Sequence, residues 1–192
     1  MDQHEPLGAV EHALREQFGS KPVRASVSFL GVEPIEILRF EPTPDERAYV
    51  SLGMSGRPMT EPAQAERTAH GPRAELLLHL RDPTDAYTDV WRTLSVLAAA
   101  PAVEGVVYRV GMTVDVSAPL VPGSRCSGGL IAGSVLPAVT ASTGVVDFLR
   151  VIPATRDELA WCRVRGSAAL LQRWQERDTD LLDLGRCSVD LD

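Results

Sequence analysis

The stretch RAELLLHLR, residues 73–81, constrains the fold of this chain more than any other feature of the sequence. Apolar residues occupy its even positions: Ala74, Leu76, Leu78 and Leu80. Because successive side chains of a β-strand point to opposite faces of a sheet, these four residues are expected to face the core, and Glu75 and His79 to lie on the polar face. Leu77 breaks the alternation, so the second face is expected to be partly covered as well.

Helical and extended patterns are mixed along the rest of the chain. Apolar residues recur at helical spacing over residues 7–18, 87–97 and 159–174. Extended patterns occupy residues 25–29, 35–40, 48–52, 105–116, 130–136 and 145–152. Thr155 followed by Glu158 is the pattern of a capping box and opens the last helix. Without strict alternation of strand and helix, this order predicts an α+β (mixed α/β) fold, in which helices flank a central sheet.

The length of the chain suits one domain. A chain of 192 residues can bury one substantial core. We expect residues 1–177 to form a single domain. Residues 178–192, which are acidic, are expected to be a loosely ordered C-terminal tail.

The charge balance bears on the class of partner. The chain has 19 Lys and Arg residues against 26 Asp and Glu residues, a net charge of −7 at pH 7. An acidic surface disfavours binding to nucleic acid or to anionic membranes, and it favours binding to a basic protein. Solubility alone would also account for the charge.

Cysteine usage and hydropathy indicate a cytoplasmic location. Cys126, Cys162 and Cys187 are widely spaced and form no CxxC pair, so free thiols in a reducing compartment are expected. The first residues have neither the basic region nor the apolar core of a secretory signal. A run of about 18 apolar residues, as a membrane-spanning helix needs, does not occur.

Motifs of catalysis and of cofactor binding fail in detail. GSRCSGG, residues 123–129, has the glycine spacing of a phosphate loop but lacks the lysine and hydroxyl that contact phosphate and magnesium. The four histidines have no second metal ligand at short spacing, and no GxSxG elbow occurs. Cys126, a loop thiol beside an arginine, leaves a redox or catalytic role open. The sequence therefore predicts no catalytic, cofactor-binding or metal-binding residue.

The stretch SLGMSGRPM, residues 51–59, admits two interpretations. In the first it is a connector, in which Gly53 lets a strand leave the sheet and Ser55 bonds back to the turn. In the second it is an exposed contact patch, because methionine adapts to irregular partners. The candidate partner-binding residues are Met54, Arg57, Met59 and, in the other glycine-rich loop, Arg125.

Five segments, taken in order, resemble the suppressor-of-fused (SUFU) domain family in its bacterial, stand-alone form. YVSLGMS (49–55) is similar to a strand that ends in a TxGxS turn, and RAELLLHLR to a GxELxxRL strand. WRTLSVLA (91–98) and APLVPGSRCSGGLI (118–131) are similar to the following helix and loop. VDFLRVIPATRDELAW (146–161) is similar to the family's FLxxxPxTxxEL ending.

The resemblance implies a SUFU-like sandwich with a mixed central sheet and no catalytic residues. Animal members bind a transcription factor as an added strand between two domains, a role not carried over to this chain. Bacterial members are associated with polymorphic toxin systems, in which they are proposed to be immunity proteins. We therefore expect a non-enzymatic protein-binding domain, most specifically an immunity protein that neutralises a toxin. The alternative is a small-molecule-binding protein or an enzyme that uses the 53–59 and 119–129 loops.

Overall fold

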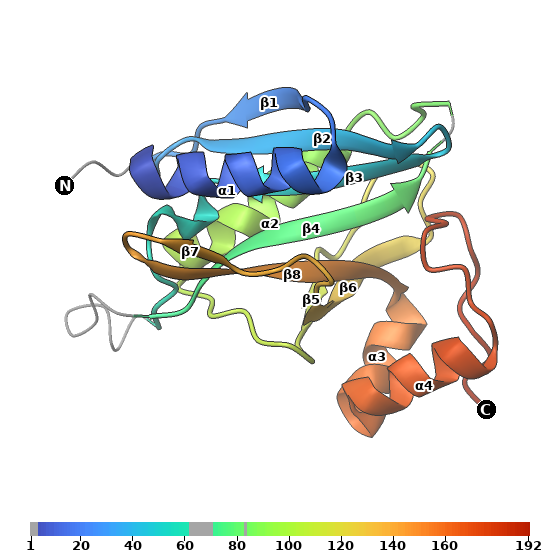
Figure 1. Cartoon of the computed structure of the whole chain (residues 1–192). Helices are drawn as coiled ribbons and strands as arrows, with labels where there is room; N and C mark the ends of the chain where they lie inside the picture. The colour runs from blue at the N-terminus through green and yellow to red at the C-terminus, as the bar shows by residue number, and fades with distance from the viewer. Residues whose placement is uncertain (1–3, 62–70, 83) are drawn as a thin grey trace.

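The computed structural model describes residues 4–61, 71–82 and 84–192. The elements follow one another in the order α1 (His4–Phe18), β1 (Val23–Val27), β2 (Ile35–Thr43), β3 (Glu46–Leu52), the short 3₁₀ helix η1 (Met54–Gly56), β4 (Arg73–Arg81), α2 (Val90–Glu104), β5 (Thr113–Asp115), β6 (Cys126–Gly133), β7 (Val139–Ala141), β8 (Gly144–Thr155), α3 (Arg156–Arg165) and α4 (Ser167–Glu176). The expected mixture of strands and helices is confirmed (Figure 1).

One mixed sheet forms the centre of the molecule. Its strands lie in the order β1-β2-β3-β4-β8-β6-β5, and β7 pairs with β8. Strands β4 and β8 run parallel, and the other pairs within the described chain are antiparallel. The strand expected at 73–81 is β4, at the predicted bounds. It is central because it joins the N-terminal hairpins to the C-terminal half of the sheet.

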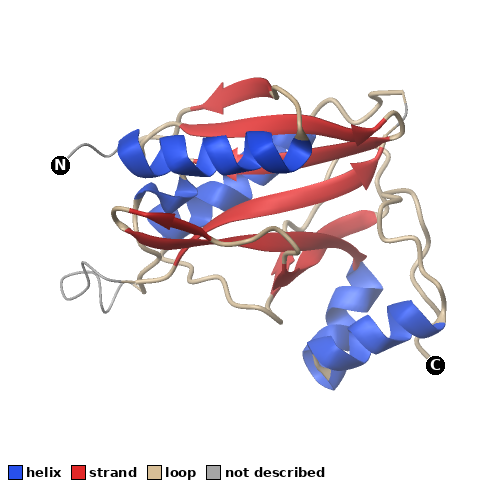
Figure 2. Cartoon of the chain, in the orientation of Figure 1, coloured by secondary structure: helices blue, strands red, loops and turns tan. Residues whose placement is uncertain are grey.

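Helices cover both faces of this sheet (Figure 2). On one face, Val10 and Leu14 of α1 pack with Leu77 and Val50. On the other face, Leu94 and other apolar residues of α2 pack with the even-numbered residues of β4. Leu77 is thus buried, as the break in the alternation predicted. The result is a three-layer arrangement of helix, sheet and helix.

Helix α2 begins later and ends later than the sequence indicates. Before the helix, the buried carboxylate of Asp82 accepts hydrogen bonds from the backbone N–H groups of Ala86 and Tyr87 and so closes a separate turn. The helix extends from Val90 to Glu104, so Pro101 lies inside it. Because proline has no N–H, the carbonyl of Leu97 lacks its usual donor, and the Tyr108 hydroxyl donates to it at 2.7 Å.

The segment expected as a glycine-rich loop at 119–129 is a loop only in its first part. Residues from Cys126 onward belong to β6, between β8 and β5. A Cβ on Gly128 would lie 2.0 Å from the carbonyl oxygen of Val114, so a glycine is required where β5 approaches. Gly128, the second glycine of the pattern that resembles a nucleotide loop, therefore serves close strand pairing.

Residues 178–192 are not a loosely ordered tail, and that expectation is wrong. Leu184 is fully buried in the core beneath α2, and its carbonyl accepts a hydrogen bond from the backbone N–H of Arg125. The carbonyl of Leu182 accepts another from the backbone N–H of Arg81. The segment runs from the end of α4 to the end of the sheet and back toward α4 (Figure 1). Near its end, Val189 packs with Leu159 of α3 and Trp174 of α4. The acidic residues of the segment stay at the surface.

Candidate functional site

A fully buried carboxylate, that of Glu75 on β4, organises the turn after β3. Its Oε1 accepts hydrogen bonds from the backbone N–H groups of Gly53 and Ser55, at 2.9 and 3.0 Å, and from the Ser55 hydroxyl at 2.6 Å. Its Oε2 accepts one from the Ser51 hydroxyl. Burial raises the pKa of Glu75, although all four donors oppose that rise. As expected, Glu75 points to the face of β4 opposite the even-numbered residues, the same face as Leu77. That face is not exposed to solvent, because other parts of the protein cover it.

The connector interpretation of SLGMSGRPM is confirmed for its first half. Gly53 has a φ of 133°, which L side chains rarely adopt, and a Cβ there would lie 3.0 Å from the carbonyl oxygen of Pro34. The Ser55 hydroxyl bonds back across the turn to Glu75. Arg73 fixes the same turn from outside, because its guanidinium donates to the Ser55 carbonyl at 2.7 Å.

The expected contact patch does not exist as a surface of methionines. Met54 and Met59 are only 6% and 3% exposed, and both belong to the core beneath α2. Their burial follows from the inward fold of the turn around Glu75. Arg57 is exposed, as is Arg125. These two arginines line different hollows of the surface, so the four candidate residues do not form one site.

A cleft of about 810 Å³ lies beside this turn. It is bounded by α1, by the segment from the end of β1 to the start of β2, by the turn after β3 and by the last turns of α2, and we call it the α1–η1 cleft. Buried apolar side chains form part of its wall: Ile35, Leu52, Met54 and Ala98. Charged side chains also line it: Glu11, Glu33, Glu36 and Arg57.

The charges of the α1–η1 cleft are unevenly paired. Arg24 donates to Glu36 at 2.7 Å and to Glu11, so it offsets two of the three carboxylates. Glu33 and Arg57 have no ion pair with any residue that the structure describes. The cleft therefore combines an apolar wall with charges of both signs, a lining suited to an amphipathic ligand or protein segment.

A second buried carboxylate, that of Glu158 on α3, holds the C-terminal segment. It accepts hydrogen bonds from both terminal nitrogens of Arg186, from the Trp174 indole at 3.0 Å and from the backbone N–H of Val189 at 2.9 Å. It also completes the predicted capping box with Thr155, which is confirmed. Burial alone would raise the pKa of Glu158, but the hydrogen bonds from Arg186 and the backbone outweigh it and lower that pKa.

The thiols do not support a nucleophile in the 119–129 segment. Cys126 is fully buried, and burial raises the pKa of its thiol to about 11. Because the thiolate is the reactive form, burial and the raised pKa both argue against the redox or catalytic role left open for Cys126. Cys187 is the exposed thiol, and the guanidinium of Arg125 lies against its Sγ. Among the described residues, no three His, Cys, Asp or Glu side chains come close enough together to hold a metal ion.

The helices of the described chain are not of the membrane-spanning kind. Within residues 4–61, 71–82 and 84–192, none of them combines the length and apolar character needed to cross a bilayer.

The fold defines the class of protein as an α+β domain with one mixed sheet and helices on both faces. Residues 31–187 match the family model described as "Suppressor of fused protein (SUFU)". The chain therefore belongs to the suppressor of fused family, and the resemblance seen in its sequence is confirmed. No curated protein matches the chain.

Solved structures share this fold at low sequence identity. A SUFU homologue from Neisseria gonorrhoeae superposes with a TM-score of 0.69 at 18% identity, over 96% of this chain and 97% of the homologue. The Sufu–Fu complex gives a TM-score of 0.71 at 16% identity, over 96% of this chain and 92% of that chain. Drosophila Suppressor of Fused gives 0.69 at 16% identity, and this chain spans about half of its length, 51%.

Proposed function

We propose that this chain is a protein-binding domain without catalytic activity. Membership of the SUFU family supports this, because one of the similar structures is a complex of Sufu with another protein, Fu. The buried carboxylates are consistent with it too, since Glu75 and Glu158 are each saturated by hydrogen-bond donors of the chain itself. Such groups stabilise the fold and are not available as a general acid or base.

More specifically, we propose an immunity protein that binds and neutralises a cognate toxin of a bacterial polymorphic toxin system. The similar chain from Neisseria gonorrhoeae is bacterial and of nearly the same extent. Association of bacterial family members with such systems motivates the choice of a toxin as partner. The observation that carries the partner's chemistry is the net charge of −7, which suits a basic toxin such as a nuclease.

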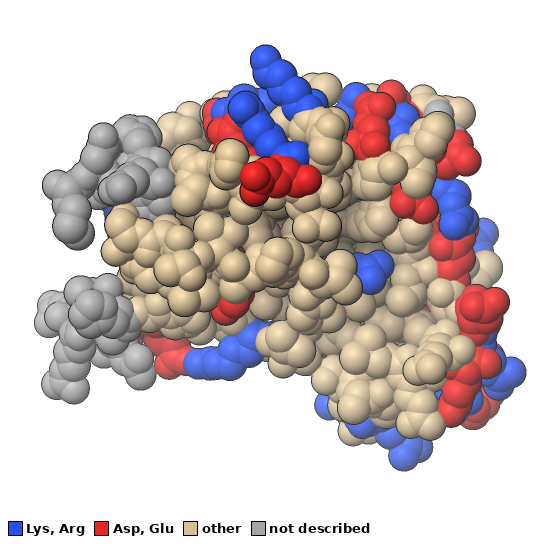
Figure 3. All heavy atoms as spheres, viewed as in Figure 1, with Lys and Arg blue, Asp and Glu red and all other residues tan. Residues whose placement is uncertain are grey.

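The charge is distributed rather than confined to one patch on the visible face. Figure 3 shows acidic and basic side chains intermixed along the edge that carries the β2–β3 turn and the C-terminal segment. Acidic and basic side chains also lie over α1, whereas the part of that face over the β7–β8 hairpin carries few charges. We therefore expect the net charge to steer a basic partner from a distance, and uncharged surface to form the contact.

Co-expression with the toxin encoded beside this gene tests the proposal. Rescue of growth together with a complex that survives size-exclusion chromatography would support it. The association rate should fall steeply as salt rises from about 0.05 to 0.5 M, since charge steering is screened. Absence of both rescue and complex would contradict the immunity role. A stable complex with a partner that is not toxic would leave only the broader protein-binding proposal.

The α1–η1 cleft favours one alternative, a small-molecule-binding protein or an enzyme. The 53–59 and 119–129 segments line separate hollows, so the alternative rests on the first of them. A metabolite that raises the melting temperature of the wild type would support it. Gly8→Leu is a matched variant, because Gly8 lines the cleft and a Cβ there meets nothing within 4 Å. The variant should abolish the rise if the metabolite occupies the cleft.

A further inference from the structure

Two arginines are brought together at the point where β6 begins and β8 ends. Cys126 of β6 pairs with Thr155 of β8, so Arg125 comes immediately before one partner and Arg156 immediately after the other. Both arginines line a hollow of about 190 Å³, which we call the Arg125–Arg156 pocket. Three serines contribute to the same lining: Ser117, Ser124 and Ser127. The Ser124 hydroxyl already donates to the carbonyl of Cys126, and one nitrogen of Arg125 donates to the Sγ of Cys187. The other two hydroxyls and the remaining guanidinium nitrogens give this pocket its hydrogen-bond donors.

An irregularity in β6 aims one of these serines away from the strand ladder. The register of β6 against β8 shifts between Cys126 and Gly128, which places Ser127 at a bulge. Bulges re-aim side chains that would otherwise alternate regularly. The Ser127 Oγ is buried and has no hydrogen-bond partner among the residues that the structure describes. A buried hydroxyl without a partner costs stability, so a ligand that bonds to it would recover that cost.

The electrostatics of the pocket favour an anion. Within the part of the chain that the structure describes, Arg156 forms no hydrogen bond or ion pair, so its guanidinium is available. Asp115 is the carboxylate in the lining, and it is already engaged. The backbone N–H of Ser117 donates to it at 2.9 Å and Arg163 at 3.1 Å, and both lower the pKa of Asp115. Arg163 pairs with Asp115, and the charge of Arg156 also lowers the pKa of Asp115, so three arginines stand against the single carboxylate of the lining.

We propose that the Arg125–Arg156 pocket binds a phosphate group, either free phosphate or the phosphate of a small monoester. Guanidinium groups match phosphate oxygens with paired N–H donors, and hydroxyls complete the coordination of such an anion. The proposal does not depend on the immunity role, because phosphate binding requires no protein partner. The pocket is also separate from the α1–η1 cleft, on which the small-molecule alternative rests. It assigns to Arg125 an anion-binding role.

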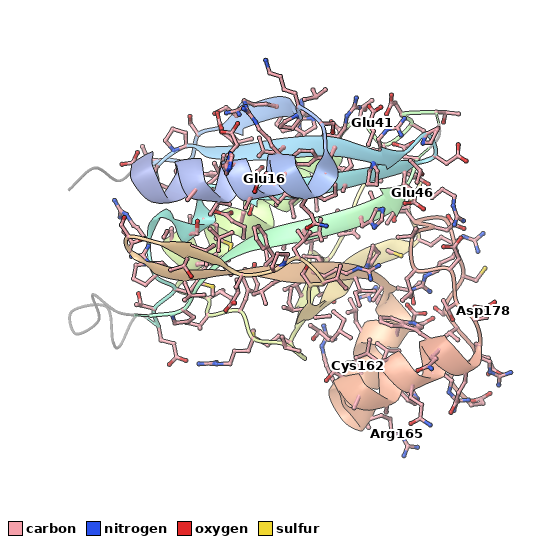
Figure 4. The ribbon with its side chains drawn as sticks, in the orientation of Figure 1. Glu16, Glu41, Glu46, Cys162, Arg165 and Asp178 are labelled. Carbon is pink, nitrogen blue, oxygen red and sulfur yellow. The ribbon has the colours of Figure 1, made fainter. Side chains whose placement is uncertain are left out.

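Thermal melting of the whole chain with inorganic phosphate as the probe tests this assignment. Phosphate at millimolar concentrations should raise the melting temperature, whereas sodium chloride of equal ionic strength should not. Arg156→Gln should weaken phosphate binding about tenfold or more, because a charged hydrogen-bond donor is lost. Arg165→Gln is the matched control: this exposed arginine lies on the same helix, at the end farther from β8 (Figure 4). It should bind phosphate like the wild type.

Ser127→Ala separates binding from stability. Removal of a buried hydroxyl without a partner should leave the phosphate-free protein as stable as the wild type or slightly more stable, while phosphate binding weakens. Glycerol 3-phosphate distinguishes the two sources of the anion: tighter binding than inorganic phosphate identifies a monoester, and weaker binding identifies the free ion. An equal rise with chloride, or a phosphate effect that persists in Arg125→Gln and Arg156→Gln, would overturn the proposal.

Discussion

Arg186 and Glu158 form a buried, bidentate ion pair that fastens the C-terminal segment to α3. The two N···O distances are 2.6 and 2.8 Å, and the side chains are 7% and 0% exposed. The guanidinium also lies over the ring of Trp174, 5.6 Å from its centroid. Because charges of this kind are costly to bury alone, each partner requires the other.

Arg186→Met should lower the free energy of unfolding by about 3–5 kcal/mol, since Glu158 is left buried without its counter-charge. Glu158→Gln combined with Arg186→Met should cost less than the sum of the two single changes. Urea denaturation measures all three variants. Arg177→Met is the control, because Arg177 forms an exposed pair with Asp190 at 2.7 Å and should cost less than about 1 kcal/mol. Strict additivity of the two single changes would contradict direct coupling.

The same pair should make the C-terminal segment sensitive to acid. The folded-state pKa of Glu158 is lowered, so its contribution is fully present above the unfolded value of 4.5 and is lost as the pH falls through the lower, folded value. The difference in unfolding free energy between wild type and Glu158→Gln should therefore be constant above about pH 5 and shrink below it. Denaturation at several pH values measures it. A difference that grows in acid would contradict the lowered pKa.

Glu75→Ala should destabilise the protein by about 3 kcal/mol or more, because several donors of the turn lose a buried acceptor. Glu75→Gln should cost less, since the amide oxygen still accepts from the backbone N–H groups while the amide nitrogen cannot accept from the Ser51 hydroxyl. Urea denaturation is the measurement, and the exposed Glu33→Ala serves as control, with an effect within about 0.5 kcal/mol. Equal effects of Glu75→Ala and Glu33→Ala would refute the role of Glu75.

Met59→Ala should lower stability by about 2–5 kcal/mol, as expected for a methionine removed from a packed core. Arg57→Ala should change stability by less than about 0.5 kcal/mol, because Arg57 is exposed. The comparison tests whether Met59 belongs to the core, since an exposed contact patch would give two small effects. Chemical denaturation of the two single variants is sufficient to decide.

Cys187 should be the one thiol of the three that reacts rapidly with Ellman's reagent in the folded protein. Cys126 and Cys162 are buried, and burial raises the pKa of both. Cys187→Ser should remove the fast phase, and unfolding in urea should release the two slow thiols. A fast phase that remains in this variant would show that the core opens more readily than its packing indicates.

Local features of the fold could be predicted from the sequence because their partners lie within a few residues. The capping box joins Thr155 and Glu158, three positions apart. The bounds of β4 follow from the alternation of apolar and polar residues within nine positions. The presence of α1 follows from apolar residues that recur at helical spacing within one segment. The family resemblance extended this local information to the whole fold, since several short motifs occur in a fixed order.

What each buried polar group does was decided only by the tertiary structure. The alternation in β4 predicts that Glu75 lies on a polar face. In the structure Glu75 is buried, because it bonds to Ser51 and Gly53, more than 20 positions earlier in the chain. Glu158 was predicted as a cap, but its pairing with Arg186 joins residues 28 positions apart. The sequence by itself determined the local hydrogen bonds, the periodicities and the net charge. The burial of the methionines, the packing of the last residues and the meeting of Arg125 with Arg156 depended on contacts between distant segments, which no local pattern encodes.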